Sequence, residues 1–171
     1  MEIPVEIKRV RENAMMPERG SDMAAGLDMR ACVDEPFEVY PGGFSELVPT
    51  GIAINIKDPR YAAILIPRSG LGHKHGIILG NSVGLIDADY QGEVFMSIWN
   101  RGEEIYTIKP QERVAQMVFV PVATPHFAVV DKFSNGTVRG DGGFGHSGEV
   151  HVVGNSILTT MTEIAEAKRR S

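Results

Sequence analysis

The 171-residue sequence is long enough for one domain of ordinary size and short for two. Apolar residues make up 43% and charged residues 23%, the balance of a soluble globular protein, and the net charge of −5 argues against a general nucleic-acid binder. The single cysteine, Cys32, excludes an intramolecular disulfide and a cysteine-built zinc site. Because the N-terminus is acidic and no apolar run reaches the roughly 18 residues of a membrane span, we expect a cytoplasmic protein.

Short segments rich in β-branched residues, separated by glycine and proline turns, predict a mainly β domain. Turn signals such as Pro41-Gly42-Gly43 and Lys109-Pro110 separate the segments at a spacing that is typical of a sandwich, barrel or jelly roll. No stretch before residue 155 shows a convincing helical period. In chain order, the predicted strands cover residues 46–56, 61–66, 77–79, 93–99, 104–108, 113–120 and 127–130.

Two segments near the C-terminus depart from this pattern. Residues 134–148 hold six of the 19 glycines, and we expect them to need another surface on which to order, because glycine loses the most backbone freedom on folding. Farther on, Ser156 is a candidate N-cap of a short helix with a basic last turn. This helix would either dock on its own domain or bind a partner. Its apolar face would comprise Ile157, Leu158, Met161, Ile164 and Ala165.

The first candidate site is the sequence PRSGLGHKHG at the end of an apolar strand. The guanidinium of Arg68, the hydroxyl of Ser69 and the accessible backbone at Gly70 suit a phosphate group. A tight turn with a surface arginine is the alternative. His73 and His75 would point the same way on a strand, but no third ligand is evident, so we favour a structural role over a metal site.

The second candidate site is the sequence GNSVGLIDADYQGEV, residues 80–94, which predicts a β-hairpin. A hairpin can present unpaired backbone groups to a planar ligand, as a strand would. Asp87 follows two apolar residues, and we expect it to face a pocket, where it could orient and deprotonate a water. Asp89 is expected to make local hydrogen bonds in the turn. Tyr90 would either form a flat floor for a sugar or base, or pack across the hairpin.

The third candidate site is the sequence RGDGGFGHSG. An aromatic residue between glycines, Phe144, with Arg139 before it and His146 and Ser147 after it, predicts a flap with one stacking side chain. A disordered linker is the alternative. The segment is not a Walker phosphate loop, because no lysine followed by serine or threonine closes it.

Five short motifs follow one another along the chain: AGLDMRA at 25–31, PRSGLG at 67–72, GLIDADYQG at 84–92, ERVAQMVF at 112–119 and RGDGGFGHSG at 139–148. Together they resemble the five motifs of the trimeric dUTP pyrophosphatases (dUTPases), in the same order. Five ordered motifs across one domain are far more specific than one alone. The sequences GHKHGIILGN and SIWNRG resemble the enterobacterial type in particular.

The resemblance implies a β jelly roll that assembles as a homotrimer with three active sites. Each site would be built from more than one subunit, with a glycine-rich C-terminal arm that crosses to cover a neighbour's pocket. The chain would then comprise a jelly-roll catalytic domain at 1–133, the arm at 134–148 and an extension at 149–171 that is a candidate helix. Most members of the family end near the fifth motif, so the role of the extension stays open, including contact with a protein partner.

The resemblance also implies roles for single residues. Asp87 would hold the attacking water and contact the deoxyribose 3′-hydroxyl, and Tyr90 would lie under the sugar and reject a 2′-hydroxyl. Asp28 and Arg113 resemble a charge network that supports the site. The remaining implied residues are Asn81, Leu85, Ile86 and Phe95 for uracil; Arg68, Ser69, Gly70 and Gln116 for the phosphates; and Arg139, Phe144, Gly145 and Ser147 in the arm.

The implied reaction is in-line attack of water on the α-phosphorus of dUTP, which gives dUMP and pyrophosphate. It would keep uracil out of DNA and supply dUMP for thymidylate synthesis. Mg²⁺ would be held by the triphosphate oxygens and by waters, with no protein side chain bound to it. Positioning and charge neutralisation would supply most of the catalysis. We expect neither nucleic acid nor membrane as a partner.

Two other functions stay open at this point. A dCTP deaminase would share the fold and the trimer, but deaminases of that kind use a glutamate near the hairpin to activate water, where this chain has Asp87. A regulatory protein that senses dUTP would use the C-terminal extension to bind its partner. Ammonia release from dCTP would identify the first, and nucleotide-dependent partner binding the second.

Overall fold

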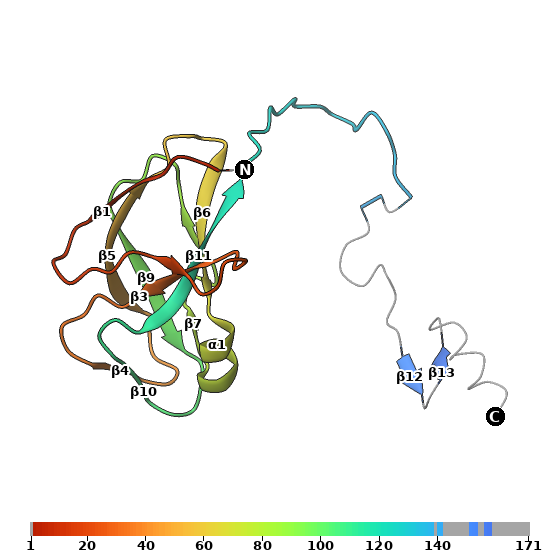
Figure 1. Ribbon diagram of the computed structural model, residues 1–171. Coiled ribbons are helices and arrows are strands. Elements are labelled where there is room, and N and C mark those ends of the chain that lie inside the picture. The colour runs from red at the N-terminus through yellow and green to blue at the C-terminus, as the bar shows by residue number, and fades with distance from the viewer. Residues whose placement is uncertain (1, 139, 142–150, 154–155, 159–171) are drawn as a thin grey trace. The chain divides into compact units, whose positions relative to one another are not determined.

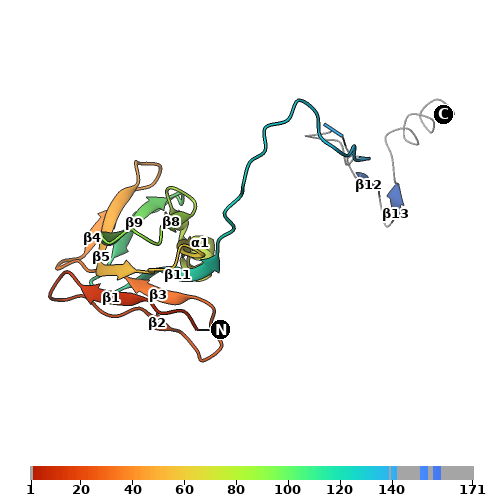
Figure 2. The same ribbon diagram turned by 90° about the horizontal axis from the view of Figure 1, so that it is seen from above.

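Two antiparallel sheets form most of the fold (Figures 1 and 2). The computed structural model describes residues 2–138, 140–141, 151–153 and 156–158. The chain divides into two units, Met1–Pro125 and His126–Ser171, and each is described by itself. The expected division into a catalytic domain, an arm and an extension stays a prediction.

The first sheet has four strands in the order β1-β5-β9-β7, and every neighbouring pair is antiparallel. Strand β9 shows an alternation of burial most clearly, because Val94, Met96 and Ile98 are buried and the residues between them are less so. The sheet therefore turns one face to the core. Its strands are β1 (Glu6–Arg9), β5 (Glu46–Asn55), β7 (Ile77–Leu79) and β9 (Glu93–Asn100).

The second sheet has five strands in the order β2-β3-β11-β6-β8, again antiparallel, with β8 as an edge strand. Strands β4 and β10 pair separately. Within the described part of the chain, no helix is long and apolar enough to cross a membrane. The elements are β2 (Glu18–Arg19), β3 (Leu27–Arg30), β4 (Phe37–Val39), β6 (Tyr61–Pro67), α1 (Ser69–His75), β8 (Gly84–Ile86), β10 (Tyr106–Ile108) and β11 (Arg113–Pro121).

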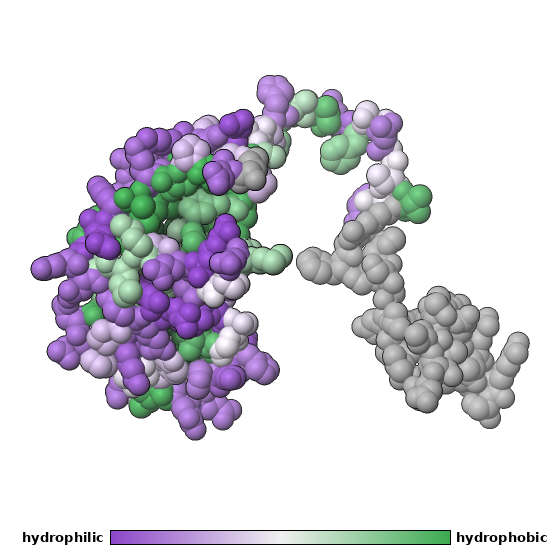
Figure 3. All heavy atoms as spheres, in the orientation of Figure 1, coloured by the Kyte–Doolittle hydropathy of each residue, from purple (hydrophilic) through white to green (hydrophobic). Residues whose placement is uncertain are grey.

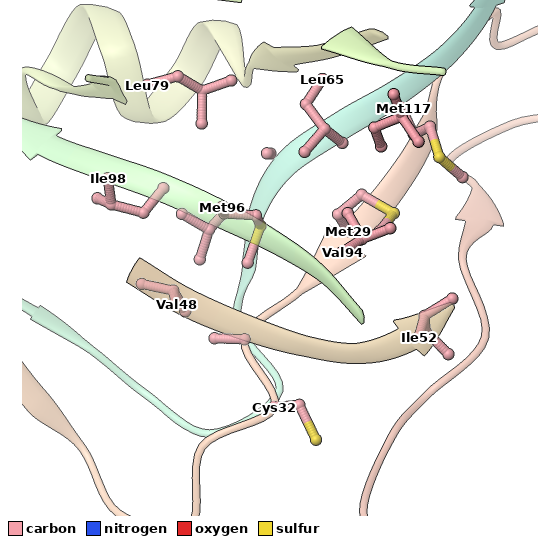
Figure 4. Packing of buried hydrophobic residues seen from close by; sticks show 14 of the residues in the cluster. Met29, Cys32, Val48, Ile52, Leu65, Leu79, Val94, Met96, Ile98 and Met117 are labelled. Carbon is pink, nitrogen blue, oxygen red and sulfur yellow. The ribbon is translucent and has the colours of Figure 1, made fainter. Parts of the chain in front are cut away.

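The hydrophobic core lies between the two sheets. Val94 and Met96 of β9 belong to the same buried cluster as Met29 of β3 and Leu65 of β6, and Figure 4 shows their side chains in the space that the strands enclose. Two sheets that share one apolar core confirm the expected mainly β, jelly-roll type of fold. Cys32 lies at the border of this core, where burial raises the pKa of its thiol.

Six of the seven predicted strands are present, and their ends differ from the prediction by one or two residues at most. The strand predicted at 127–130 is wrong: these residues form no strand, and the side chains of Phe127 and Val129 are 83% and 100% exposed. Although residues 127–130 are apolar, no strand of the described chain pairs with them. The prediction also missed the four strands before residue 46, β1 to β4. In β1 all four residues are exposed and so show no alternation of burial.

Helix α1 contradicts the expectation that no helix precedes residue 155. It is seven residues long and contains two glycines, and Arg68 at its N-cap position makes no capping hydrogen bond through its side chain, so the usual signals of a helix are missing. It ends at Gly76, which has a left-handed φ of 70° and donates its N–H to the carbonyl oxygen of Leu71. A Cβ at Gly76 would lie 2.4 Å from the backbone nitrogen of Gly102, so only glycine fits there.

The position of His73 and His75 on this helix changes their interpretation. Residues two apart on an α-helix point to nearly opposite sides, so the expectation that the two rings point the same way is wrong. The ring of His75 instead packs at 5.1 Å from that of Tyr106, as the structural role requires. The pKa of Tyr106 is raised, mainly by burial and secondly by the hydrogen bond that its hydroxyl donates to the carboxylate of Glu112. No group of three or more potential metal ligands occurs among the described residues.

In the second unit, β12 (His151–Val153) pairs with β13 (Ser156–Leu158) in an antiparallel hairpin. The helix predicted to begin at Ser156 therefore does not begin there. The pairing joins Val152 to Ile157, and β-branched residues suit a strand better than a helix. The rest of the predicted helix lies outside the described residues.

Asn100, at the end of β9, is a buried polar residue whose side chain joins three segments. Its amide nitrogen donates to the carbonyl oxygens of Val39 and Glu104, each at 2.8 Å, and its amide oxygen accepts the N–H of Gly102 at 2.9 Å. All its hydrogen-bonding groups are engaged, so the bonds that hold the β4–β9–β10 region together offset the cost of removing the amide from water.

We predict that Asn100→Ala lowers the free energy of unfolding by about 2–4 kcal/mol, because it leaves two carbonyls and one amide without their partner, and the carbonyl of Val39 is buried while the other two bonds are half-buried. Urea denaturation measures this change. Asn13→Ala is the matched control: Asn13 is exposed and its side chain makes one long hydrogen bond, at 3.3 Å, to Asp34, so we expect a change within about 0.5 kcal/mol. Equal effects of the two substitutions would contradict the prediction.

Candidate active site

A cavity of about 240 Å³ lies beside the segment that connects β8 to β9, and we call it the loop cavity. Asp87 lines it and is exposed to solvent, as a residue that holds a water must be. Asp89, from the same segment, does not line it. The structure thus brings together six residues singled out in the sequence: Asn81, Leu85, Ile86, Asp87, Tyr90 and Phe95.

The segment that forms this cavity is not the β-hairpin that the sequence predicts. Strand β8 pairs with β6 in the five-stranded sheet, with Ile86 opposite Ala63, whereas β9 pairs with β5 and β7 in the other sheet. Residues 87–92 therefore cross from one sheet to the other. Because β8 is an edge strand, one side of its backbone has no strand partner in the described chain. Leu85, at its centre, is 66% exposed.

The ring of Tyr90 is held by the backbone that follows it. Its hydroxyl donates to the carbonyl oxygen of Glu93 at 2.8 Å, and its N–H donates to the carbonyl oxygen of Asp87 at 3.2 Å, which closes the turn. A Cβ at Gly92 would lie 2.5 Å from the hydroxyl oxygen of Tyr90 and 2.7 Å from the adjoining ring carbon. The ring therefore takes its place only because residue 92 has no side chain.

Sequence reasoning missed Glu93, which also lines the loop cavity. Its carboxylate forms a two-pronged ion pair with Arg11, which lies 82 positions away along the chain. Nothing in the sequence links these two residues, because charged residues are frequent and only the fold brings this pair together.

A second cavity, of about 350 Å³, gathers the predicted phosphate-binding groups, and we call it the arginine cavity. Arg68 and Ser69 reach it from the start of α1, and Gln116 reaches it from β11. Ser69 and Gly70 are exposed there, and a Cβ at Gly70 would meet no atom within 4 Å. The backbone at this point is open to a ligand.

Asp28 organises the charges of the arginine cavity. Its carboxylate accepts from Nε of Arg68 and from a terminal nitrogen of Arg113, each at 3.0 Å. Arg68 also donates to the backbone carbonyl oxygen of Arg113 at 3.1 Å. Two guanidinium groups share one carboxylate, which leaves an excess of positive charge that suits an anion. The expected charge network of Asp28 and Arg113 is therefore present.

Gln116 is fixed by its neighbours on both sides. Its amide nitrogen donates to the carbonyl oxygen of Pro67 at 3.1 Å, which ties β11 to the residue just before the predicted phosphate-binding groups. A Cβ at Gly26 would lie 2.5 Å from its amide oxygen. The glycine of the first motif thus leaves room for the glutamine of the fourth.

The two cavities share no lining residue. Within one chain, Asp87 and Tyr90 therefore line a different cavity from Arg68 and Gln116. The predicted arm residues cannot be placed against either cavity, because they lie outside the described residues: Arg139, Phe144, Gly145 and Ser147.

Comparison with known proteins gives a consistent result. A model of the dUTPase family matches residues 12–148. The deoxyuridine 5′-triphosphate nucleotidohydrolase of Salmonella typhimurium is 58% identical over 140 residues, which cover 82% of this chain and 91% of that protein. The proteins of the same name from Shigella flexneri and Cronobacter sakazakii are each 57% identical over the same length and share of each chain.

Solved structures of phage dUTPases resemble this fold. The dUTPase of Staphylococcus bacteriophage 80alpha, solved with dUPNHPP, has a TM-score of 0.74 and 29% identity, and the match covers 85% of this chain and 99% of that one. Phage dUTPases of this kind are described as controlling the transfer of virulence genes. A variant dUTPase from phage phi11 of S. aureus, with a structural Mg(II) ion, has a TM-score of 0.69 and 25% identity over 77% of this chain and 99% of its own.

The contact between Gly92 and Tyr90 gives a prediction. Gly92→Ala should lower the free energy of unfolding by about 1–3 kcal/mol or displace the Tyr90 ring, because the new Cβ and the ring cannot occupy the same space. Urea denaturation together with a crystal structure of the variant measures both. Gly43→Ala is the control, since a Cβ there meets only a carbonyl oxygen at 3.7 Å. An unmoved ring at unchanged stability would show that the contact is not restrictive.

Proposed function

The chain belongs to the dUTPase family and hydrolyses dUTP to dUMP, and from this premise we propose that Asp87 directs a water onto the α-phosphorus. The water oxygen forms a bond to phosphorus, its proton passes to the Asp87 carboxylate, and the bond to the β-phosphate breaks to release pyrophosphate. One observation carries the proposal: the loop cavity places an exposed carboxylate beside an aromatic ring and an open strand edge. The alternative of a dCTP deaminase is set aside, because the family and its relatives hydrolyse dUTP.

In this proposal the loop cavity binds the nucleoside. Backbone groups of β8 at Leu85 and Ile86, with Asn81 and Phe95, bind uracil, whose donors and acceptors differ from those of cytosine. Tyr90 lies under the deoxyribose, and its fixed ring leaves no room for a 2′-hydroxyl. The support is geometric, since the ring is held between its hydrogen bonds and the backbone of residue 92.

The arginine cavity would bind the phosphates. Arg68, Ser69, Gly70 and Gln116 offer donors around an open space, and the carboxylate of Asp28 is already engaged by two arginines. This donor set suits phosphate oxygens better than a bare cation. Mg²⁺ would be held by the triphosphate oxygens and by waters, and it would supply charge neutralisation to the leaving pyrophosphate. We propose the cytoplasm as the location.

We further propose that a homotrimer completes the site. The loop cavity and the arginine cavity share no residue, so a site that needs both is formed where two subunits meet. Phe127 and Phe133 before the arm and Val138 within it carry large apolar side chains that are exposed to solvent. Figure 3 shows green, apolar spheres along this part of the chain. Burying these side chains against a neighbouring subunit would stabilise the assembly and deliver Arg139, Phe144, Gly145 and Ser147 to the neighbour's substrate.

Asp87→Asn tests the role of the carboxylate. We expect it to keep dUTP binding and to lower the rate of pyrophosphate release by about 10²–10⁴-fold, because an amide cannot accept the proton of the water. The wild-type protein should act on dUTP far faster than on dCTP, dTTP and UTP in the same assay with Mg²⁺. Asp89→Asn is the matched control, since Asp89 lies in the same loop but does not line the cavity. Near-normal turnover by Asp87→Asn would refute the assigned role.

Mixed trimers test whether two subunits share each site. Asp87→Asn and Arg68→Gln should each be nearly inactive alone. Refolding the two together in equal amounts should restore about a quarter of wild-type activity, because that fraction of interfaces pairs an intact loop cavity with an intact arginine cavity. Refolding each variant with itself is the control. If the mixture stays inactive while trimers form, each site lies within one chain.

A further inference from the structure

The ion pair between Arg11 and Glu93 has the geometry of a firm connection. Nε of Arg11 lies 2.6 Å from one carboxylate oxygen of Glu93, and a terminal nitrogen lies 3.0 Å from the other. The Glu93 side chain is only 15% exposed. The hydrogen bonds to Glu93 raise the pKa of Arg11 above its usual value. A two-pronged arginine–carboxylate pair fixes orientation as well as distance.

Glu93 connects this pair to Tyr90, which lines the loop cavity. One of its carboxylate oxygens also accepts the N–H of Gly51 in β5 at 2.9 Å, and its backbone carbonyl oxygen accepts the hydroxyl of Tyr90 at 2.8 Å. Arg11 belongs to the N-terminal segment, so Glu93 links this segment to Tyr90 by hydrogen bonds. A shift of Glu93 would move the atom to which the Tyr90 hydroxyl is bound.

This connection replaces a missing stretch of backbone pairing. Strands β5 and β9 pair in register up to Pro49 opposite Phe95, and pairing resumes only at Ala53 opposite Glu93. Across the gap, side chains do the joining: the hydroxyl of Thr50 donates to the carbonyl oxygen of Val94 at 2.7 Å, and the Glu93 carboxylate accepts from β5. The start of β9, next to the loop cavity, is thus held by side chains where a regular ladder is absent.

The N-terminal turn is packed closely enough to make the connection stiff. Gly51 has a left-handed φ of 70°, and a Cβ there would lie 2.5 Å from Cβ of Ala14 and 3.2 Å from Cβ of Arg11. The N–H of Val10 donates to the carbonyl oxygen of Gly51 at 2.8 Å. Arg11 is therefore set against β5 by backbone contact, and its side chain reaches Glu93 from a fixed base.

We propose that the Arg11–Glu93 ion pair is a positioning device that fixes Tyr90 and thereby sets the preference of the site for deoxyribose over ribose. The inference rests on the proposed role of Tyr90 under the sugar. Neither Arg11 nor the Glu93 carboxylate needs to touch the substrate. They act by keeping the ring where a 2′-hydroxyl would collide with it, and a looser ring would admit UTP.

Substitutions of the pair test this proposal by the ratio of kcat/KM for dUTP to that for UTP. Glu93→Gln keeps an oxygen for Gly51 but loses the ion pair, and Arg11→Gln loses the fork. We expect each to lower the ratio about tenfold, the lower end of what a shaped pocket achieves. The double variant should be no worse than either single one, because both remove the same interaction. The ratio of dissociation constants for UMP and dUMP should fall in parallel, and this second readout needs no turnover.

Arg60→Gln is the matched control, because Arg60 forms the same kind of two-pronged pair with Asp58 but does not line the loop cavity. An unchanged dUTP/UTP ratio in folded Glu93→Gln and Arg11→Gln would overturn the proposal, as would an equal loss in Arg60→Gln. If both glutamine variants unfold, Arg11→Lys is the deciding variant, because lysine keeps the positive charge but cannot make the two-pronged contact. We expect its dUTP/UTP ratio of kcat/KM to fall by about threefold. An unchanged ratio would refute the inference. Failure of wild-type dUTP hydrolysis would refute the proposed function alone, since the mononucleotide binding ratio still tests the ion pair.

Discussion

The backbone between β8 and β9 has to pass from one sheet to the other, and the loop cavity depends on this crossing. β8 pairs with β6 in the five-stranded sheet, and β9 pairs with β5 in the four-stranded sheet. A hairpin whose strands paired with each other would satisfy its own hydrogen bonds and would leave no space between its arms. Because the strands separate, the edge of β8 stays open, and Asp87 and Tyr90 lie on the segment that joins the two sheets.

The arginine cavity is locally positive, although the chain as a whole is negatively charged. The net charge of the chain is −5, but in the arginine cavity Arg68 and Arg113 share the single carboxylate of Asp28. Asp28 holds both guanidinium groups in place while cancelling only one of the two charges. An acidic protein can therefore bind a highly charged anion, since the field near the ligand is set by the nearest groups.

The sequence predicts the parts of this protein better than their arrangement. Strands such as β9 were predictable because buried and exposed residues alternate along them, and Asp87 because it follows an apolar pair in a turn. Helix α1 was not predictable, because it has neither a capping side chain nor an apolar stripe. The Arg11–Glu93 pair could not be inferred, since its partners meet only in the folded chain. The separation of the two cavities likewise depends on tertiary structure and not on motif order.

The reaction of Cys32 with a thiol reagent can report on the packing of the N-terminal region. Its side chain is 6% exposed, and a Cβ at Gly51 would lie 2.8 Å from its sulfur, so the thiol sits directly behind the strand that anchors Glu93. A thiol reagent can reach it only when this packing opens, and the raised pKa keeps the reactive thiolate scarce. With one cysteine in the chain, the kinetics of labelling report local opening at one known place, without any engineered probe.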